Sequence, residues 1–318
     1  MKYLYLALAC TLFSVQFVFT KGFSRRASSA THVGLWNGCV VSLSMALYLF
    51  PMNGFRFEFT PAAGLVALCL ALCAVTMSLC NIPAMRLGNM AVVTTYMLVG
   101  GMVLPFGYGV LALKEDCSPL KLVAIAVLIA AIIPNLLQGK GEQTGVQRSR
   151  GKTILFHGLC MVLFTLNGMT SILTTVHSLH ENKISSGGFT LLSGLCQLSV
   201  TALILLGYAI YRRVKGEQQP FRSTFVEVTK ATPTTARALL ILMAFGFCFA
   251  LCNGVANIFS QESLSAGMPS SVQFPVISGS VIVLTALFGN WFFGERIDRY
   301  CAISLVLSVI GSVLFMLA

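Results

Sequence analysis

Long apolar runs constrain the fold of this chain more than any other feature of its sequence. A helix needs about 20 mostly apolar residues to cross the roughly 30 Å hydrocarbon core of a bilayer, whereas barrel strands would alternate over about 10 residues. The unbroken runs therefore predict an all-α polytopic membrane protein with ten transmembrane helices. The predicted helices span residues 3–20, 33–53, 61–85, 89–113, 119–138, 153–177, 187–211, 236–260, 269–293 and 299–317.

Composition also favours a membrane location. Hydrophobic residues make up 56% of the 318 residues and charged residues only 10%, which leaves too little polar surface to cover a soluble globule of this length. The first run stands where a secretory signal would stand, but no A-x-A cleavage site follows it, and Lys21, Arg25 and Arg26 come after it. We therefore expect this run to remain as a transmembrane helix.

The two halves of the sequence repeat one plan. Residues 81–134 correspond to residues 257–317; Cys69 and Cys248 lie 179 residues apart, and Glu115 and Glu295 lie 180 apart. Each half holds five of the ten predicted helices. Because five is odd, the second half must cross the membrane in the opposite direction. We predict two inverted five-helix repeats, residues 1–145 and 146–318, an arrangement typical of secondary transporters.

Positive charge is distributed unevenly among the predicted connections. Sixteen of the 21 Lys and Arg residues lie in or beside odd-numbered connections, and five lie near even-numbered connections or the termini. The positive-inside rule then places the odd-numbered connections in the cytoplasm and both termini outside. The net charge of +11 therefore predicts contact between the loops and anionic lipid head groups of the bilayer, and we expect no binding of nucleic acid.

Each half carries landmarks of a known transporter family. A polar segment ends the third helix of each half, and an acidic residue follows the fourth helix, in Lys114-Glu115-Asp116 and in Gly294-Glu295-Arg296. With these landmarks the chain resembles the drug/metabolite transporter superfamily, in its ten-span EamA-type branch. The resemblance implies a secondary transporter that moves small organic solutes by alternating access, with export as the direction.

The same resemblance implies a central cavity lined by the third, fourth, eighth and ninth helices, with contributions from the first and sixth. We expect an integral, multi-pass protein of a bacterial plasma membrane. Members of this family usually have both termini in the cytoplasm, so the charge distribution of this chain departs from the family. A homodimeric assembly stays open.

Polar side chains inside the predicted helices are the candidates for the substrate site, because an uncompensated polar group is costly in hydrocarbon. Asn253, Asn257 and Gln261 share one helix face at four-residue spacing. Each candidate could instead join two helices through a hydrogen bond worth about 0.6–2 kcal/mol. The predicted substrate-binding residues are Gln16, Asn81, Thr95, Tyr96, Asn167, Asn253, Asn257, Gln261, Gln273 and Phe274.

Four further residues are predicted to have structural or hinge roles. Pro105 and Pro275 each lie inside a predicted helix, where a proline frees a backbone carbonyl and can kink the helix. Glu115 and Glu295 lie at helix ends, where they can accept hydrogen bonds or pair with the adjacent Lys114 and Arg296.

The acidic residues bear on how transport would be driven. All ten Asp and Glu residues lie in loops or at helix ends, with Glu262 the acid close enough to a helix to matter. A proton-driven cation pump would be expected to hold a carboxylate within the membrane. We therefore expect neutral or zwitterionic substrates such as amino acids, metabolites or drug-like compounds, moved by facilitated diffusion or another form of coupling.

The sequence shows no catalytic or cofactor motif. It lacks the phosphate-binding G-x-x-x-x-G-K-[ST], so we expect no nucleotide cofactor. Matched Cys pairs at four-residue spacing, such as Cys69 and Cys73, have no His nearby, and small residues at this spacing suit helix packing, so we expect no metal. The alternative to transport is a membrane-embedded enzyme acting on a lipid-borne substrate, for which the patch from His177 to Glu181 offers the only cluster of suitable side chains.

Overall fold

The computed structural model describes residues 2–26, 31–114, 117–134, 150–216, 235–266, 270–295 and 297–317. Ten helices lie within these residues, which confirms the prediction of an all-helical chain with ten helices. Their bounds are α1 Lys2–Arg26, α2 Thr31–Met52, α3 Pro61–Leu87, α4 Met90–Leu111, α5 Pro119–Ala130, α7 Arg150–Leu179, α8 Ser186–Val214, α10 Thr235–Ser265, α11 Ser270–Phe293 and α12 Arg299–Leu317.

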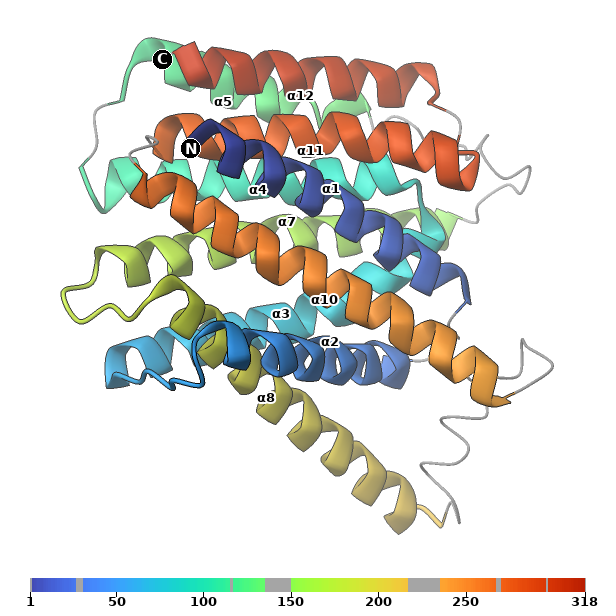
Figure 1. Cartoon of the computed structure of the whole chain (residues 1–318). Helices are drawn as coiled ribbons and strands as arrows, with labels where there is room; N and C mark the ends of the chain where they lie inside the picture. Colours follow the sequence, from blue (N-terminus) through green and yellow to red (C-terminus); the bar gives the residue numbers. More distant parts are fainter. Residues whose placement is uncertain are drawn as a thin grey trace.

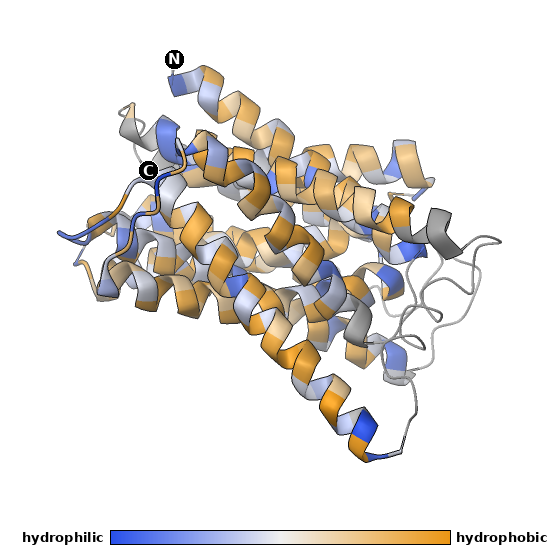
Figure 2. Ribbon diagram, turned by 60° about the horizontal axis from the view of Figure 1, so that its bottom comes forward, coloured by the Kyte–Doolittle hydropathy of each residue, from blue (hydrophilic) through white to orange (hydrophobic). Residues whose placement is uncertain are grey.

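The outer surface of the bundle is apolar along the helices. Eight of the helices in the described part of the chain are long and apolar enough to cross a membrane, while α5 and α12 are shorter apolar helices. Large side chains such as Leu65, Leu203 and Leu206 are exposed, and Figure 2 shows hydrophobic residues along the whole length of the helices. Such an extended apolar surface requires an apolar solvent, consistent with an integral, multi-pass membrane protein.

Contacts between the helices join the two halves of the chain. In Figure 1, α5 packs on α12 at one edge of the bundle and α2 on α8 at the opposite edge, with the other helices between them. Helix α1 contacts α10 and α11, and α7 contacts α3 and α4. Each of these six contacts pairs a helix from the first half with a helix from the second, so neither half forms a separate bundle.

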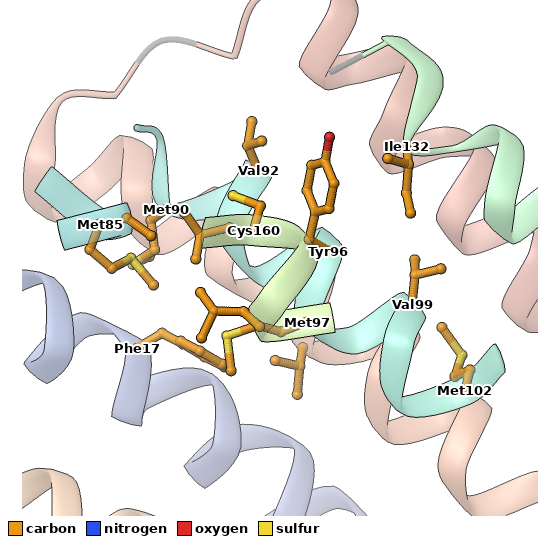
Figure 3. Packing of buried hydrophobic residues seen from close by; sticks show 14 of the residues in the cluster. Phe17, Met85, Met90, Val92, Tyr96, Met97, Val99, Met102, Ile132 and Cys160 are labelled. Atoms are coloured by element: carbon orange, nitrogen blue, oxygen red, sulfur yellow. The ribbon is translucent and has the colours of Figure 1, made fainter. Parts of the chain in front are cut away.

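Helix α4 forms the centre of the main hydrophobic cluster. Its buried side chains, including Met90, Tyr96 and Met97, pack with Phe17 of α1 and Met85 of α3 (Figure 3). Small residues allow close approach of neighbouring helices in a membrane. Gly100 of α4 is such a residue, because an added Cβ would lie 2.1 Å from the carbonyl oxygen of Phe164 in α7.

A two-residue break separates α3 from α4. Asn89 caps α4 by accepting a hydrogen bond from the backbone N–H of Ala91 at 2.9 Å. Gly88 is in close contact with α7, since an added Cβ would lie 2.1 Å from the ring of Phe156. The break brings the last carbonyl groups of α3 and the first N–H groups of α4, which have no partner within their own helices, to one point near the end of the bundle.

The structure corrects the predicted end of the first helix. That helix was expected to span residues 3–20 with Lys21 following it, but α1 continues to Arg26 and the Lys21 side chain is only 5% exposed. We call this end of the bundle, where Lys21 lies beside the α3–α4 break, the Lys21 end. The opposite end, which holds Glu58 between α2 and α3, is called the Glu58 end.

Candidate functional site

Three amide side chains form a connected chain between α1 and α10. Asn253 donates from Nδ2 to Oε1 of Gln16 at 2.7 Å. Asn257 donates from Nδ2 to the carbonyl oxygen of Asn253 at 2.8 Å and to its Oδ1 at 3.3 Å. We call Gln16, Asn253 and Asn257 the amide chain. Gln16 is buried, and Asn253 and Asn257 are half-buried. The amide chain is thus a neutral polar group that joins a helix of the first half to a helix of the second.

A second polar contact joins α10 to α11. Gln273 is fully buried and donates from Nε2 to the carbonyl oxygen of Ser260 at 2.8 Å and to its hydroxyl oxygen at 2.7 Å. Its Oε1 has no hydrogen-bond partner among the described residues. Gln261 and Phe274 are half-buried. Sequence reasoning missed Ser260, although a hydroxyl three residues after Asn257 continues the same polar helix face.

The remaining candidates on α4 and α7 form a separate group. Tyr96 is fully buried, and its hydroxyl lies 3.2 Å from Nδ1 of His157. Asn167 donates from Nδ2 to the carbonyl oxygen of Met97 at 2.8 Å. These bonds join α4 to α7, whereas Thr95 bonds to a carbonyl of its own helix. His157 was not predicted as a partner, although its position inside a helix was the available signal.

Asn81 occupies the last two turns of α3. Its side chain is half-buried, and its Oδ1 is enclosed with no hydrogen-bond partner in the described part of the chain. A buried acceptor without a donor costs roughly 1–3 kcal/mol. A solute with a hydrogen-bond donor could therefore bind to Oδ1 of Asn81 and remove this cost.

A buried ion pair lies at the Lys21 end. Nζ of Lys21 is 2.8 Å from Oε1 of Glu295, and the two side chains are 5% and 10% exposed. Nζ also donates to the carbonyl oxygens of Met85 and of Gly88, the latter at 2.8 Å. The second carboxylate oxygen, Oε2, accepts from the backbone N–H of Met90 at 3.0 Å. We call this arrangement the ionic lock.

The ionic lock fits the α3–α4 break by charge. The ammonium group binds carbonyl oxygens at the C-terminal end of α3, where the helix dipole favours a cation, and the carboxylate binds an N–H at the N-terminal end of α4, where it favours an anion. The partner of Glu295 is thus Lys21, which was interpreted as a loop charge, while the suggested partner Arg296 lies outside the described residues.

The two prolines that were predicted as hinges do not interrupt their helices. Pro105 lies within α4 and Pro275 within α11, and neither helix is interrupted there. Glu115 lies outside the described residues. Glu262 is exposed in the last turn of α10, so it is not enclosed with the amide chain.

The two His residues near the α7–α8 turn accept hydrogen bonds from backbone groups. Nε2 of His177 accepts from Ile184 N–H at 3.4 Å, and Nδ1 of His180 accepts from Asn182 N–H at 3.0 Å. Nowhere in the described residues do three or more His, Cys, Asp or Glu side chains gather as they would to hold a metal ion. These contacts organise the α7–α8 turn.

Comparison with known proteins finds likeness at the level of fold. No family model and no curated protein sequence matches the chain. A solved crystal structure, described only as that of a protein, is similar over 99% of this chain and 96% of its own, with a TM-score of 0.61 and 12% sequence identity. The arrangement of helices described above is therefore shared with a known structure over almost the whole length of both chains.

Proposed function

We propose that this protein is a secondary transporter of the drug/metabolite type, similar to the EamA branch, which moves small organic solutes across a bacterial plasma membrane. Its two halves, residues 1–145 and 146–318, act as inverted five-helix repeats and give alternating access, with export as the direction. Its partners are the solute and the lipid bilayer, and a homodimer stays open as its assembly.

The pairing of helices supports the inverted repeats. Exchanging the halves replaces α1 by α7, α2 by α8, α3 by α10, α4 by α11 and α5 by α12. Under this exchange the contact of α1 with α10 becomes α7 with α3, α1 with α11 becomes α7 with α4, and α2 with α10 becomes α8 with α3; all six contacts exist. The self-matching contacts of α2 with α8, α4 with α11 and α5 with α12 also exist. Two halves with interchangeable contacts are what alternating access requires.

Backbone geometry at matched turns supports the same relation. Gly294 has a positive φ of 65°, and Lys114, which precedes it by 180 residues, has a positive φ of 56°. A left-handed residue other than Gly, Asn or Asp is uncommon. A residue with positive φ therefore occurs at matched sequence positions after α4 and α11, although Lys114 is the third residue after its helix and Gly294 the first.

The amide chain is the observation that carries the proposed function. It places three neutral amide groups between α1 of the first half and α10 of the second, inside helices where a polar group is retained at a cost. The acidic residues that the structure describes lie in connections or at helix ends, as Glu58, Glu262 and Glu295 do. A neutral site of this kind suits neutral or zwitterionic solutes, which bring balanced charge.

Flux measurements with purified protein test the proposal. In proteoliposomes, radiolabelled neutral amino acids and a drug-like cation would be assayed for uptake and efflux with and without a pH gradient. Asn253→Leu removes the central donor of the amide chain, and we expect flux of the transported probe to fall about tenfold or more, the equivalent of one lost buried hydrogen bond. Thr165→Val is the matched control, because that exposed hydroxyl bonds to a carbonyl of its own helix.

Two results would contradict the proposal. One is the absence of flux above empty liposomes for every probe in the panel. The other is gradient-driven flux that Glu262→Gln abolishes and Asn253→Leu leaves unchanged. That result would show that an exposed acid couples transport to protons and that the amide chain does not contribute to flux.

A further inference from the structure

The ionic lock ties together segments from both halves of the chain. Lys21 comes from α1, Met85 and Gly88 from the end of α3, and Met90 from the start of α4, all in the first half, whereas Glu295 follows α11 in the second half. A movement that parts α1 and the α3–α4 break from the turn after α11 separates Lys21 from Glu295.

Glu295 is directed into the lock by the turn after α11. Gly294 adopts a positive φ of 65°, its N–H donates to the carbonyl of Asn290 at 3.0 Å, and the N–H of Glu295 donates to the carbonyl of Gly289 at 3.1 Å. This C-terminal cap reverses the chain and turns the carboxylate back toward the helix end. These hydrogen bonds fix the backbone of Glu295 without any contribution from Lys21.

Further contacts reinforce closure at the same end. Arg25 donates from Nη2 to the carbonyl oxygen of Phe293 at 3.1 Å, and Arg86 donates from Nε to the carbonyl oxygen of Ser24 at 2.6 Å. At the Glu58 end, hydrogen bonds join the α2–α3 connection to the α7–α8 turn: Oε2 of Glu58 accepts from the Ser185 N–H at 2.7 Å, and Oγ1 of Thr60 donates to the carbonyl oxygen of Asn182 at 3.1 Å. The two ends are thus closed by different chemistry.

The energetics of a buried ion pair suit a contact that opens and closes. Burying two charges costs about as much hydration free energy as their attraction returns. If opening admits water, hydration offsets the lost attraction, so the closed and open states stay close in free energy. An apolar contact of the same size would instead expose hydrophobic surface on opening, at roughly 25 cal/mol for each Å².

We propose that Lys21 and Glu295 form the gate that closes the Lys21 end of the solute pathway in this conformation. The amide chain lies deeper in the bundle, since Gln16 precedes Lys21 by five residues in α1, about 7.5 Å along a helix. Separation of Lys21 from Glu295 connects the amide chain to the water on that side. The gate rests on the proposed transport function, and its test does not require a known solute.

Accessibility of one cysteine tests the gate. Asn81→Cys is made in a variant whose native cysteines are replaced. It places a thiol four residues before Met85 in α3, deeper in the bundle than the ionic lock. A membrane-impermeant maleimide is added from the Lys21 side of oriented vesicles. We expect slow labelling with the lock intact and about tenfold faster labelling with Glu295→Gln, since losing the pair shifts the population toward the open state.

Two further variants make the result decisive. Lys21→Ala combined with Glu295→Ala removes both charges and the contact between them and leaves no buried charge unpaired, so it keeps the test valid if Glu295→Gln alone does not fold. We expect it to label as fast as Glu295→Gln. Glu58→Gln is the matched control at the other end, and we expect it to leave labelling from the Lys21 side unchanged.

Unchanged labelling in the folded double variant would overturn the gate, as would equal acceleration by Glu58→Gln. Neither result depends on flux. A protein that shows the expected labelling but moves no probe would retain the gate and lose the proposed function, whereas flux without a change in labelling would do the reverse.

Discussion

At the residue scale, Lys21 and Glu295 differ in what surrounds them. Lys21 contacts carbonyl oxygens of Met85 and Gly88, while Glu295 contacts the N–H of Met90. The site is therefore polarised by the ends of α3 and α4, and the two charges cannot be exchanged without placing each against backbone dipoles of the wrong sign.

This asymmetry predicts the stability of charge variants. Removing one partner, as in Lys21→Met, strands a buried charge and should lower the free energy of unfolding by about 3–5 kcal/mol, while Lys21→Met with Glu295→Met should cost less. The exchange Lys21→Glu with Glu295→Lys should fail to restore stability. Thermal unfolding in detergent measures all three. A stable exchanged variant would mean that the ion pair alone, without the helix ends, holds this contact.

At the scale of the elements, the connections after α4 and α11 each hold a residue with positive φ, 180 positions apart in the sequence. Lys114 adopts the left-handed conformation that Gly294 adopts in the second half, and a side chain in this region costs roughly 1–2 kcal/mol. Lys114 is exposed, so removing its side chain takes away little buried surface.

Replacement of these two residues should therefore act in opposite directions. Lys114→Gly should raise the midpoint of thermal unfolding, by relieving about 1 kcal/mol of backbone strain, and Gly294→Ala should lower it by a similar amount. Gly107→Ala in α4 is a control, because nothing lies within 4 Å of an added Cβ there. A loss of stability in Lys114→Gly would show that the lysine side chain contributes more than its backbone conformation costs.

At the scale of the whole molecule, the structure refines the distribution of charge between the two ends. Two of the sixteen basic residues used to orient the chain, Lys21 and Arg86, bind groups within the protein. Exposed basic residues still gather at the Lys21 end, among them Arg25, Lys152 and Lys215. The positive-inside rule therefore still predicts that this end faces the cytoplasm.

Labelling from each side of the membrane tests this orientation. Lys215→Cys, at the end of α8, should react with an impermeant reagent only from the cytoplasmic side, and Asn182→Cys, between α7 and α8, only from outside. Both positions are exposed, so burial cannot hide either one. The opposite pattern would show that both termini lie in the cytoplasm, as in the family that the sequence resembles.

The sequence by itself determined the helices of this protein. Runs of about 20 apolar residues have one solution in a bilayer, since every backbone group must be satisfied within its own segment. Length and hydropathy are local properties, so the bounds of α3, α4 and α11 followed closely from residues alone. The end of α1 did not, because a lysine at residue 21 is equally compatible with a loop and with a buried partner far along the chain. The fifth helix was also predicted too long, since it was expected over residues 119–138 and α5 ends at Ala130.

Only the tertiary structure decided which polar residues meet. Gln16 joins Asn253 across 237 positions and Lys21 joins Glu295, while Tyr96 and Asn167 bond between α4 and α7 and so belong to helix packing. Hydrogen bonds and ion pairs depend on distances of about 3 Å, and these distances arise from the crossing of whole helices. Composition identifies the residues that need a partner, and helix packing selects the partner.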